Sequence, residues 1–224
     1  MMKFAPEGLP FFIGTALLTL LTYFMSNVWV TAIPCCLFLF MFVFFRDPDR
    51  AVPAEADAIV SPADGRIIVV KDIREEEYFK CDVLKISIFM SPLNVHVNRA
   101  PYSGRVKSVK HTPGSFYKAF LDEASLKNEN IAMVLDTDKG EILVRQVAGS
   151  VARRAVCRVS PGHELKTGER YGMIKFSSRV DLYFPHNAQA GVKINVKIGD
   201  TVKAGESILA YWKSEKRKFD EESA

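Results

Sequence analysis

The chain has 224 residues, a formal net charge of +4 and 48% hydrophobic residues. These values exclude a disordered acidic tail, a collagen-like repeat and a small disulfide scaffold, and the length predicts one or two domains with a substantial core. A pI near 8.8 is too low for nucleic-acid binding to be the leading hypothesis. The mean hydropathy of +0.04 is an average over a strongly apolar segment and a polar domain.

The apolar segment is Leu9–Phe45, which contains no charged side chain. It is longer than the roughly 20 residues that one helix needs to cross hydrocarbon, and far longer than a signal-peptide core. Ser26 and Asn27 divide it into Leu9–Met25 and Val28–Phe45, which predicts two short transmembrane helices in a hairpin. The alternative is one tilted span with a buried or interfacial segment, which would place the following domain across the membrane from the N-terminus.

Cations flank the apolar segment on both sides, with Lys3 before it and Arg46 and Arg50 after it. Because segments on the cytoplasmic side are enriched in Lys and Arg, both ends of the hairpin are expected in the cytoplasm. Residues 1–45 are therefore expected to anchor the protein in the cell (inner) membrane. The four cysteines have no metal-ligand spacing, so they indicate a reducing compartment and no metal site.

Residues 46–212 show a different pattern and are expected to form a β-rich catalytic domain, followed by a charged tail over residues 213–224. Apolar runs spaced by about ten residues and separated by Gly and Pro predict a mostly β fold, sandwich or barrel-like. One helix is predicted over Phe116–Lys127. The predicted strands are Val83–Phe89, Ile142–Val147, Val156–Val159, Arg179–Phe184 and Val192–Val196.

An internal repeat supports this fold class. Val159–Glu169 and Val196–Glu206 share Val, Gly, Lys, Gly and Glu at equivalent positions. The pattern resembles the half-units of lipoyl- and biotinyl-type barrel-sandwich domains. A cofactor-carrying lysine in those domains stands in an Asp-Lys-Ala or Met-Lys-Met context, and the repeat contains neither, so we interpret it as architecture only.

Three motifs carry candidate chemistry: Asp64 in Val60–Arg66, His96 in Met90–Pro101, and the pair Ser177-Ser178 in Met173–Pro185. Each has an ordinary explanation when taken alone, because Pro, Asp and Gly favour turns and a single histidine in a β segment is commonly structural. No Gly-x-Ser-x-Gly motif occurs, so a serine hydrolase is not supported.

Together and in this order, the motifs resemble those of the phosphatidylserine decarboxylase proenzyme family, in its short bacterial and archaeal form. The resemblance covers almost all of Arg46–Trp212. It implies a pyruvoyl-dependent enzyme that converts phosphatidylserine to phosphatidylethanolamine and CO2, with a phospholipid substrate that suits a membrane anchor. Further matching segments are Gly104–Val106, His111–Gly114, Gln146–Arg154 and Gly168–Gly172.

The resemblance also implies residue roles. Ser178 would attack the preceding carbonyl, the chain would cleave between Ser177 and Ser178, and Ser178 would become the pyruvoyl group. His96 would take the hydroxyl proton and Asp64 would orient the imidazole, which is the logic of a Ser-His-Asp triad. The β chain (1–177) and the α chain (178–224) would stay associated.

Two residues depart from the family pattern. Ser177 stands where the family usually has glycine, and serine adopts some backbone conformations less easily than glycine. Arg99 stands where long forms have a second histidine, which leaves open how the processing base and the decarboxylation acid are divided. Arg99 and His111 are weaker candidates for substrate binding.

Two other functions remain open at this point. A decarboxylase of archaeal-type serine ether lipids would use the same headgroup chemistry. A membrane-tethered barrel-sandwich adaptor without catalysis would explain the repeat and the anchor, but not the joint presence of Asp64, His96 and Ser178. No nucleic-acid partner is expected, and a homo-oligomer is left open.

Overall fold

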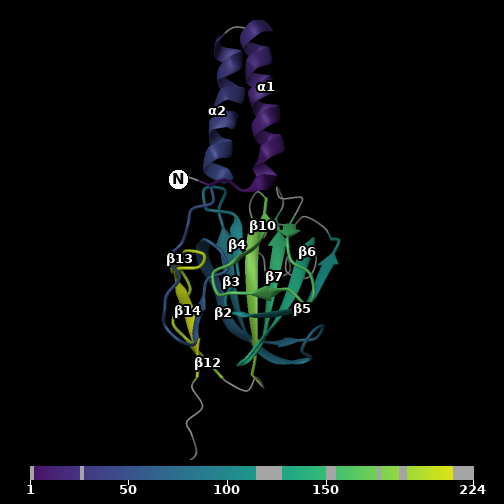
Figure 1. Ribbon diagram of the computed structural model, residues 1–224, viewed down its shortest axis with the longest axis vertical. Coiled ribbons are helices and arrows are strands. Elements are labelled where there is room, and N and C mark those ends of the chain that lie inside the picture. Colours follow the sequence, from purple (N-terminus) through teal and green to yellow (C-terminus); the bar gives the residue numbers. More distant parts are fainter. Residues whose placement is uncertain are drawn as a thin grey trace, which may run out of the picture.

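The computed structural model describes residues 3–25, 28–114, 128–149, 155–175, 178–186 and 191–213. A helical hairpin stands at one end of a mostly β domain, and the long strands of that domain curl around one another (Figure 1). The predicted fold class is therefore confirmed. The predicted helix Phe116–Lys127 lies outside the described residues.

The hairpin consists of α1 (Leu9–Met25), which follows a short 3-10 turn, η1 (Pro6–Gly8), and α2 (Val28–Phe44). Pro6–Met25 has the length and hydropathy to cross a membrane, whereas α2 is apolar but only 17 residues long. Large apolar side chains lie exposed along both helices, as is typical of lipid-facing surfaces and rare on soluble monomers. The hairpin geometry follows the prediction closely, because the helix boundaries coincide with the ends of the two uncharged runs.

Three antiparallel sheets build the β domain. The largest has eight strands, in the order β13 (Thr201–Val202), β2 (Gly65–Glu75), β3 (Cys81–Met90), β11 (Ser178–Pro185), β7 (Gly140–Ala148), β6 (Asn130–Thr137), β5 (Gly104–Thr112) and β9 (Glu164–Leu165). The two small sheets are β1 (Ala58–Val60), β14 (Ile208–Trp212) and β12 (Val192–Ile194), and β4 (Val97–Arg99), β10 (Arg170–Ile174) and β8 (Ala155–Cys157).

All five predicted strands are present, as β3, β7, β8, β11 and β12. The sequence predicts no bounds for three long strands, β2, β5 and β6. In β2 and β5 many side chains are exposed or half-buried, so charged residues such as Lys71 and Lys107 interrupt the apolar pattern that a strand prediction needs.

Strand β11 lies at the centre of the largest sheet. It pairs along its length with β3 on one side and with β7 on the other, and all eight of its residues are buried. Val180, Leu182 and Phe184 point into the main core. Ser178 is the first residue of this strand, so its backbone position is fixed by both neighbours.

The internal repeat is a structural duplication. Gly162 donates its backbone hydrogen to Val106 at 2.8 Å, and its counterpart Gly199 donates to Ile67 at 2.8 Å. Both glycines have φ near +90°, a conformation that favours glycine. Strand β9 then pairs with the beginning of β5, as β13 pairs with the beginning of β2. The repeat therefore represents architecture, as interpreted from the sequence.

Candidate active site

The candidate nucleophile Ser178 is fully buried. Its hydroxyl donates to the sulfur of Met90 at 3.5 Å, and Met90 is also its register partner on β3. A thioether is a weak acceptor, so the hydroxyl proton is held loosely and remains available to a stronger base. Ser177 lies outside the described residues.

Two buried amides extend this contact. The side-chain nitrogen of Asn98 lies 3.9 Å from the Met90 sulfur, and the Asn98 oxygen accepts a hydrogen bond from Gln146 at 2.8 Å. The oxygen of Gln146 is buried and has no hydrogen-bond partner among the described residues. No role for these amides follows from the sequence, because they come from β4 and β7 and only the fold links them through Met90 to Ser178.

The candidate base His96 directly precedes β4 and is fully buried. Its Nδ1 lies 2.9 Å from the carbonyl oxygen of Asn94. Because a carbonyl oxygen only accepts, Nδ1 carries the proton of the neutral ring and Nε2 carries the lone pair. Nε2 is buried without a hydrogen-bond partner in the described part of the chain.

Burial lowers the pKa of His96 to about 4, an effect that the Asn94 hydrogen bond opposes and the Arg46 charge reinforces. The imidazole is therefore neutral at physiological pH. A general base must be neutral and must have a lone pair that can accept a proton, and His96 Nε2 meets both requirements.

The candidate acid Asp64 ends the turn between β1 and β2. Its two oxygens accept hydrogen bonds from Arg50 at 3.0 and 2.8 Å, and Oδ1 also accepts from the backbone of Ala204 at 2.8 Å. Among the described residues, the orienting hydrogen bond on His96 thus comes from Asn94. Asp64 instead joins two segments that are distant in the sequence. One is the linker between α2 and β1, which contains Arg50, and the other is the C-terminal segment after β13, which contains Ala204.

The three predicted residues surround one short strand, β4. His96 precedes β4, and its backbone carbonyl accepts a hydrogen bond from the backbone of Ile174 at 3.2 Å. Asn98, on β4, contacts the sulfur of Met90, which in turn accepts from Ser178. On the other side of β4, the backbone of Arg99 donates to Pro62 in the Asp64 turn at 2.9 Å. In this conformation no hydrogen bond within the described ranges joins the three side chains directly. Catalytic contacts are often looser before substrate or reaction tightens them.

The two weaker candidates occupy different surroundings. Arg99 is buried and donates to the carbonyls of Gly168 and Pro48 at 2.9 Å, with Asp47 at 3.3 Å. Its guanidinium therefore faces the linker in this conformation. His111 lies half-exposed on β5, 3.1 Å from Glu129. The substrate-binding roles of Arg99 and His111 stay predictions.

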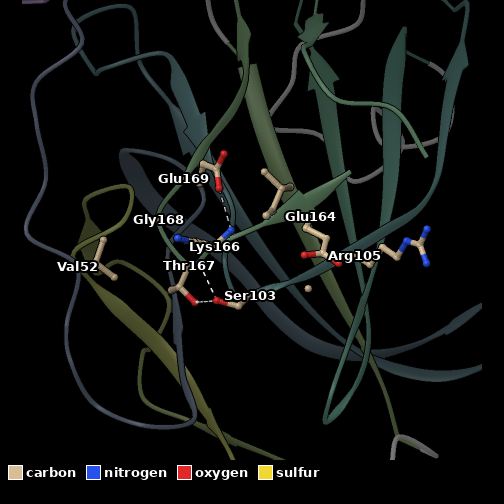
Figure 2. A pocket seen from close by; sticks show the side chains of 10 residues that line it. Val52, Ser103, Arg105, Glu164, Lys166, Thr167, Gly168 and Glu169 are labelled. Carbon is tan, nitrogen blue, oxygen red and sulfur yellow. Dashed lines mark hydrogen bonds between the residues drawn. The ribbon is translucent and has the colours of Figure 1, made fainter. Parts of the chain in front are cut away.

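A wide surface depression of about 970 Å³ does not include the candidate residues (Figure 2). It lies over the Val159–Glu169 copy of the duplicated unit, where the Ser103 hydroxyl accepts from the Thr167 backbone at 2.9 Å. This hydrogen bond is the counterpart of the one between Asp64 and Ala204. It identifies the Asp64 contact with the C-terminal segment as a structural clasp, present in both copies. The depression is lined by Val52, Ser103–Arg105 and Glu164–Glu169.

The clasp at Asp64 is expected to contribute more stability than the clasp at Ser103. Asp64→Asn removes the negative charge beside the Arg50 guanidinium, whose side chain is 8% exposed. Glu206 at 3.4 Å is then its remaining carboxylate partner among the described residues, and breaking such a buried pair costs about 3 kcal/mol. Ser103→Ala removes a neutral contact at the surface and costs about 1 kcal/mol. Denaturant unfolding of both variants in detergent, each in a Ser178→Ala chain, measures the difference. Equal losses would contradict the clasp assignment.

Comparisons with known proteins identify the family of this chain. The family model for phosphatidylserine decarboxylase matches residues 37–210. The phosphatidylserine decarboxylase proenzyme of Nitrosomonas europaea is 45% identical over 208 residues, covering 92% of this chain and 94% of that protein. The proenzyme of Desulfotalea psychrophila is 44% identical over 206 residues (92% and 94%), and that of Ralstonia pickettii 46% over 205 residues (88% and 92%). The chain therefore belongs to the phosphatidylserine decarboxylase family.

Proposed function

We propose that this protein is a membrane-anchored enzyme that cleaves its own chain before Ser178 and then decarboxylates phosphatidylserine to phosphatidylethanolamine. The observation that carries the proposal is the neutral, buried His96, whose Nε2 accepts no hydrogen bond from the described residues. His96 lies next to β4, whose residue Asn98 contacts Met90, the neighbour of Ser178. The names of the relatives, which describe decarboxylase proenzymes, support both halves of the proposal.

In the first step the Ser178 oxygen attacks the carbonyl carbon of Ser177 while His96 Nε2 takes the hydroxyl proton. The C–N bond breaks, the nitrogen gains a proton, and an ester links the two residues. Loss of the Ser178 Cα proton then expels the ester carboxylate, which becomes the new C-terminus at Ser177. Water replaces the nitrogen at residue 178, and ammonia leaves.

The product of these steps is a pyruvoyl group at residue 178, and the residues present fit it. It would stand at the buried head of β11, where the Asn98 amide nitrogen lies 3.9 Å from the Met90 sulfur that Ser178 contacts, and an amide N–H is a donor from which a carbonyl oxygen can accept. The group supplies an electron sink when the substrate amine is joined to it and CO2 leaves. His96 is the residue proposed to hold and return the proton.

The proposed part of Asp64 is to hold the turn between β1 and β2 in place beside β4. Its bonds to Arg50 and Ala204 hold Pro62 against β4, and β4 begins directly after His96. A direct bond from Asp64 to His96 would require the carboxylate to turn away from Arg50. The role of Asp64 in orienting the imidazole stays a prediction.

The hairpin is proposed to hold the enzyme in the cell (inner) membrane with the β domain on the cytoplasmic side. Pro6–Met25 supports membrane association by length and composition, and Lys3 and Arg46 support the orientation. A lipid substrate then reaches the domain from the bilayer in which the hairpin lies. The ether-lipid alternative differs in the tails, which lie away from the reacting headgroup, and the adaptor hypothesis does not account for family membership.

Self-cleavage is tested by intact mass and by labelling of the detergent-solubilised full chain. The parent is expected to give residues 1–177 and 178–224, the second with an N-terminus that is blocked to Edman degradation and reacts with a carbonyl reagent. Ser178→Ala is expected to abolish cleavage, and His96→Ala to slow it by at least about 100-fold, because a general base contributes about that much. Ser177→Gly serves as the control that restores the usual family residue and is expected to cleave at least as fast.

A parent chain that stays uncut and still releases CO2 from phosphatidylserine in mixed micelles would contradict the mechanism. An intact, inactive parent that Ser177→Gly restores would show that Ser177 blocks the reaction. Parallel assays with ester-linked and ether-linked serine lipids decide between the two lipid classes, and binding of partners without CO2 release would favour the adaptor.

The two chains are expected to stay associated after cleavage. Strand β11 belongs to the C-terminal chain and lies hydrogen-bonded between β3 and β7 of the N-terminal chain, and β14 pairs with β1 in the same way. Size-exclusion chromatography in detergent should therefore elute both fragments in one peak, which separates only in denaturant. Separate elution under native conditions would contradict this expectation.

A further inference from the structure

The last residue of α2 contacts the candidate base. The ring centroid of Phe44 lies 4.1 Å from that of His96, with the two planes tilted by 32°. Both side chains have no exposed surface. The membrane hairpin thus forms one wall of the pocket that holds His96.

This contact belongs to a small core separate from the main core of the β domain. Its members come from the hairpin on one side and from the strands around His96 on the other. They are Ala5, Met41, Phe44, Phe45, Val95, Val97 and Met173. Because this core is shared, the position of α2 determines the shape of the histidine pocket.

A second contact, from a residue that follows α2, holds the turn that binds the imidazole. Arg46 donates to the carbonyl of Leu93 at 2.7 Å, in the turn whose next residue, Asn94, holds His96 Nδ1. Phe44 therefore covers one face of the imidazole, and the Asn94 carbonyl binds its Nδ1 edge. Rotation of the imidazole would break one contact or the other, so Nε2 keeps one direction.

We propose that Phe44 is a positioning residue for His96: its ring fixes the imidazole plane and excludes water from it, so that seating of the hairpin and self-cleavage are coupled. The inference rests on the proposed role of His96 as the base. Phe44 acts in this proposal through its ring contact with His96.

The surroundings predict a distinct pH signature for the loss of this ring. The groups packed on His96 from α2, from the 91–95 turn and from β10 are uncharged, and Arg46 is the charged residue that acts on it from the linker. A change in the pH profile between pH 5 and 8 would therefore report the hydration of His96.

The test compares Phe44→Leu with Phe45→Leu in the full chain in detergent. Phe45 is a matched control, because it is equally buried in the same core, and its aromatic contacts are with Phe11, Phe12 and Phe44. Phe44→Tyr keeps the ring and is the rescue variant. The first-order rate of self-cleavage is measured by gel from pH 5 to 8, with the melting temperature of each variant measured in parallel.

Phe44→Leu admits water to His96, so the pKa of the imidazole should rise toward its ordinary 6.5 and the ring should protonate as the pH falls. Its cleavage rate should then fall about tenfold from pH 8 to pH 5.5. The parent, Phe44→Tyr and Phe45→Leu should stay nearly flat over that range, although Phe45→Leu loses a similar amount of thermal stability.

A readout independent of activity uses Ser178→Ala chains that stay uncut. The ring resonances of His96, assigned by comparison with a His96→Gln chain, should titrate at least about one pH unit higher with Phe44→Leu than with Phe45→Leu. Identical rates, profiles and titrations for these two variants would overturn the positioning role while leaving His96 as the base. A His96→Ala chain that cleaves as fast as the parent would overturn the base assignment and the inference together.

Discussion

The buried ion pair between Arg50 and Asp64 joins three parts of the chain that the fold must keep together. Arg50 belongs to the linker after the hairpin, Asp64 to the turn beside β4, and Ala204, which donates to the same carboxylate, to the C-terminal segment. A buried pair of this kind adds modest stability when formed, but it is costly to break. It therefore acts mainly by excluding other arrangements of the linker. Asp47, which pairs with Arg170 and Arg99, in the same way ties the residues just after the helical hairpin to the β domain.

Cutting the chain before Ser178 is compatible with this architecture because the sheet does not depend on the peptide bond that is lost. Ser178 is held by register pairs on both sides, with Met90 and with Ala148. The C-terminal chain is further held through β13, β14 and the clasp at Asp64. Under the proposed cleavage, Ser178 can therefore become a chain terminus without leaving its place in the core.

The sequence predicted what depends on local pattern. The hairpin boundaries followed from the absence of charge, the apolar strands from their runs, and the duplication from glycines that the structure holds at positive φ. The half-exposed strand β2 was missed because its exposed face carries charges. The partners of the candidate residues were not foreseen either: topology brings Arg50 to Asp64 and Phe44 to His96, and the contact of Asn94 with His96 depends on the conformation of the turn before β4.

The burial that leaves His96 neutral also makes it a weak base, and the proposed reaction tolerates this. Self-cleavage has to occur once in the life of each chain, so a modest rate suffices. Decarboxylation needs the opposite state, a proton donor, in every turnover. The proposed cleavage releases a carboxylate at Ser177, and a negative charge close to an imidazole raises its pKa. One histidine, held in place by the anchor, would then have a physical route from base before cleavage to acid after it, without the second histidine that Arg99 replaces.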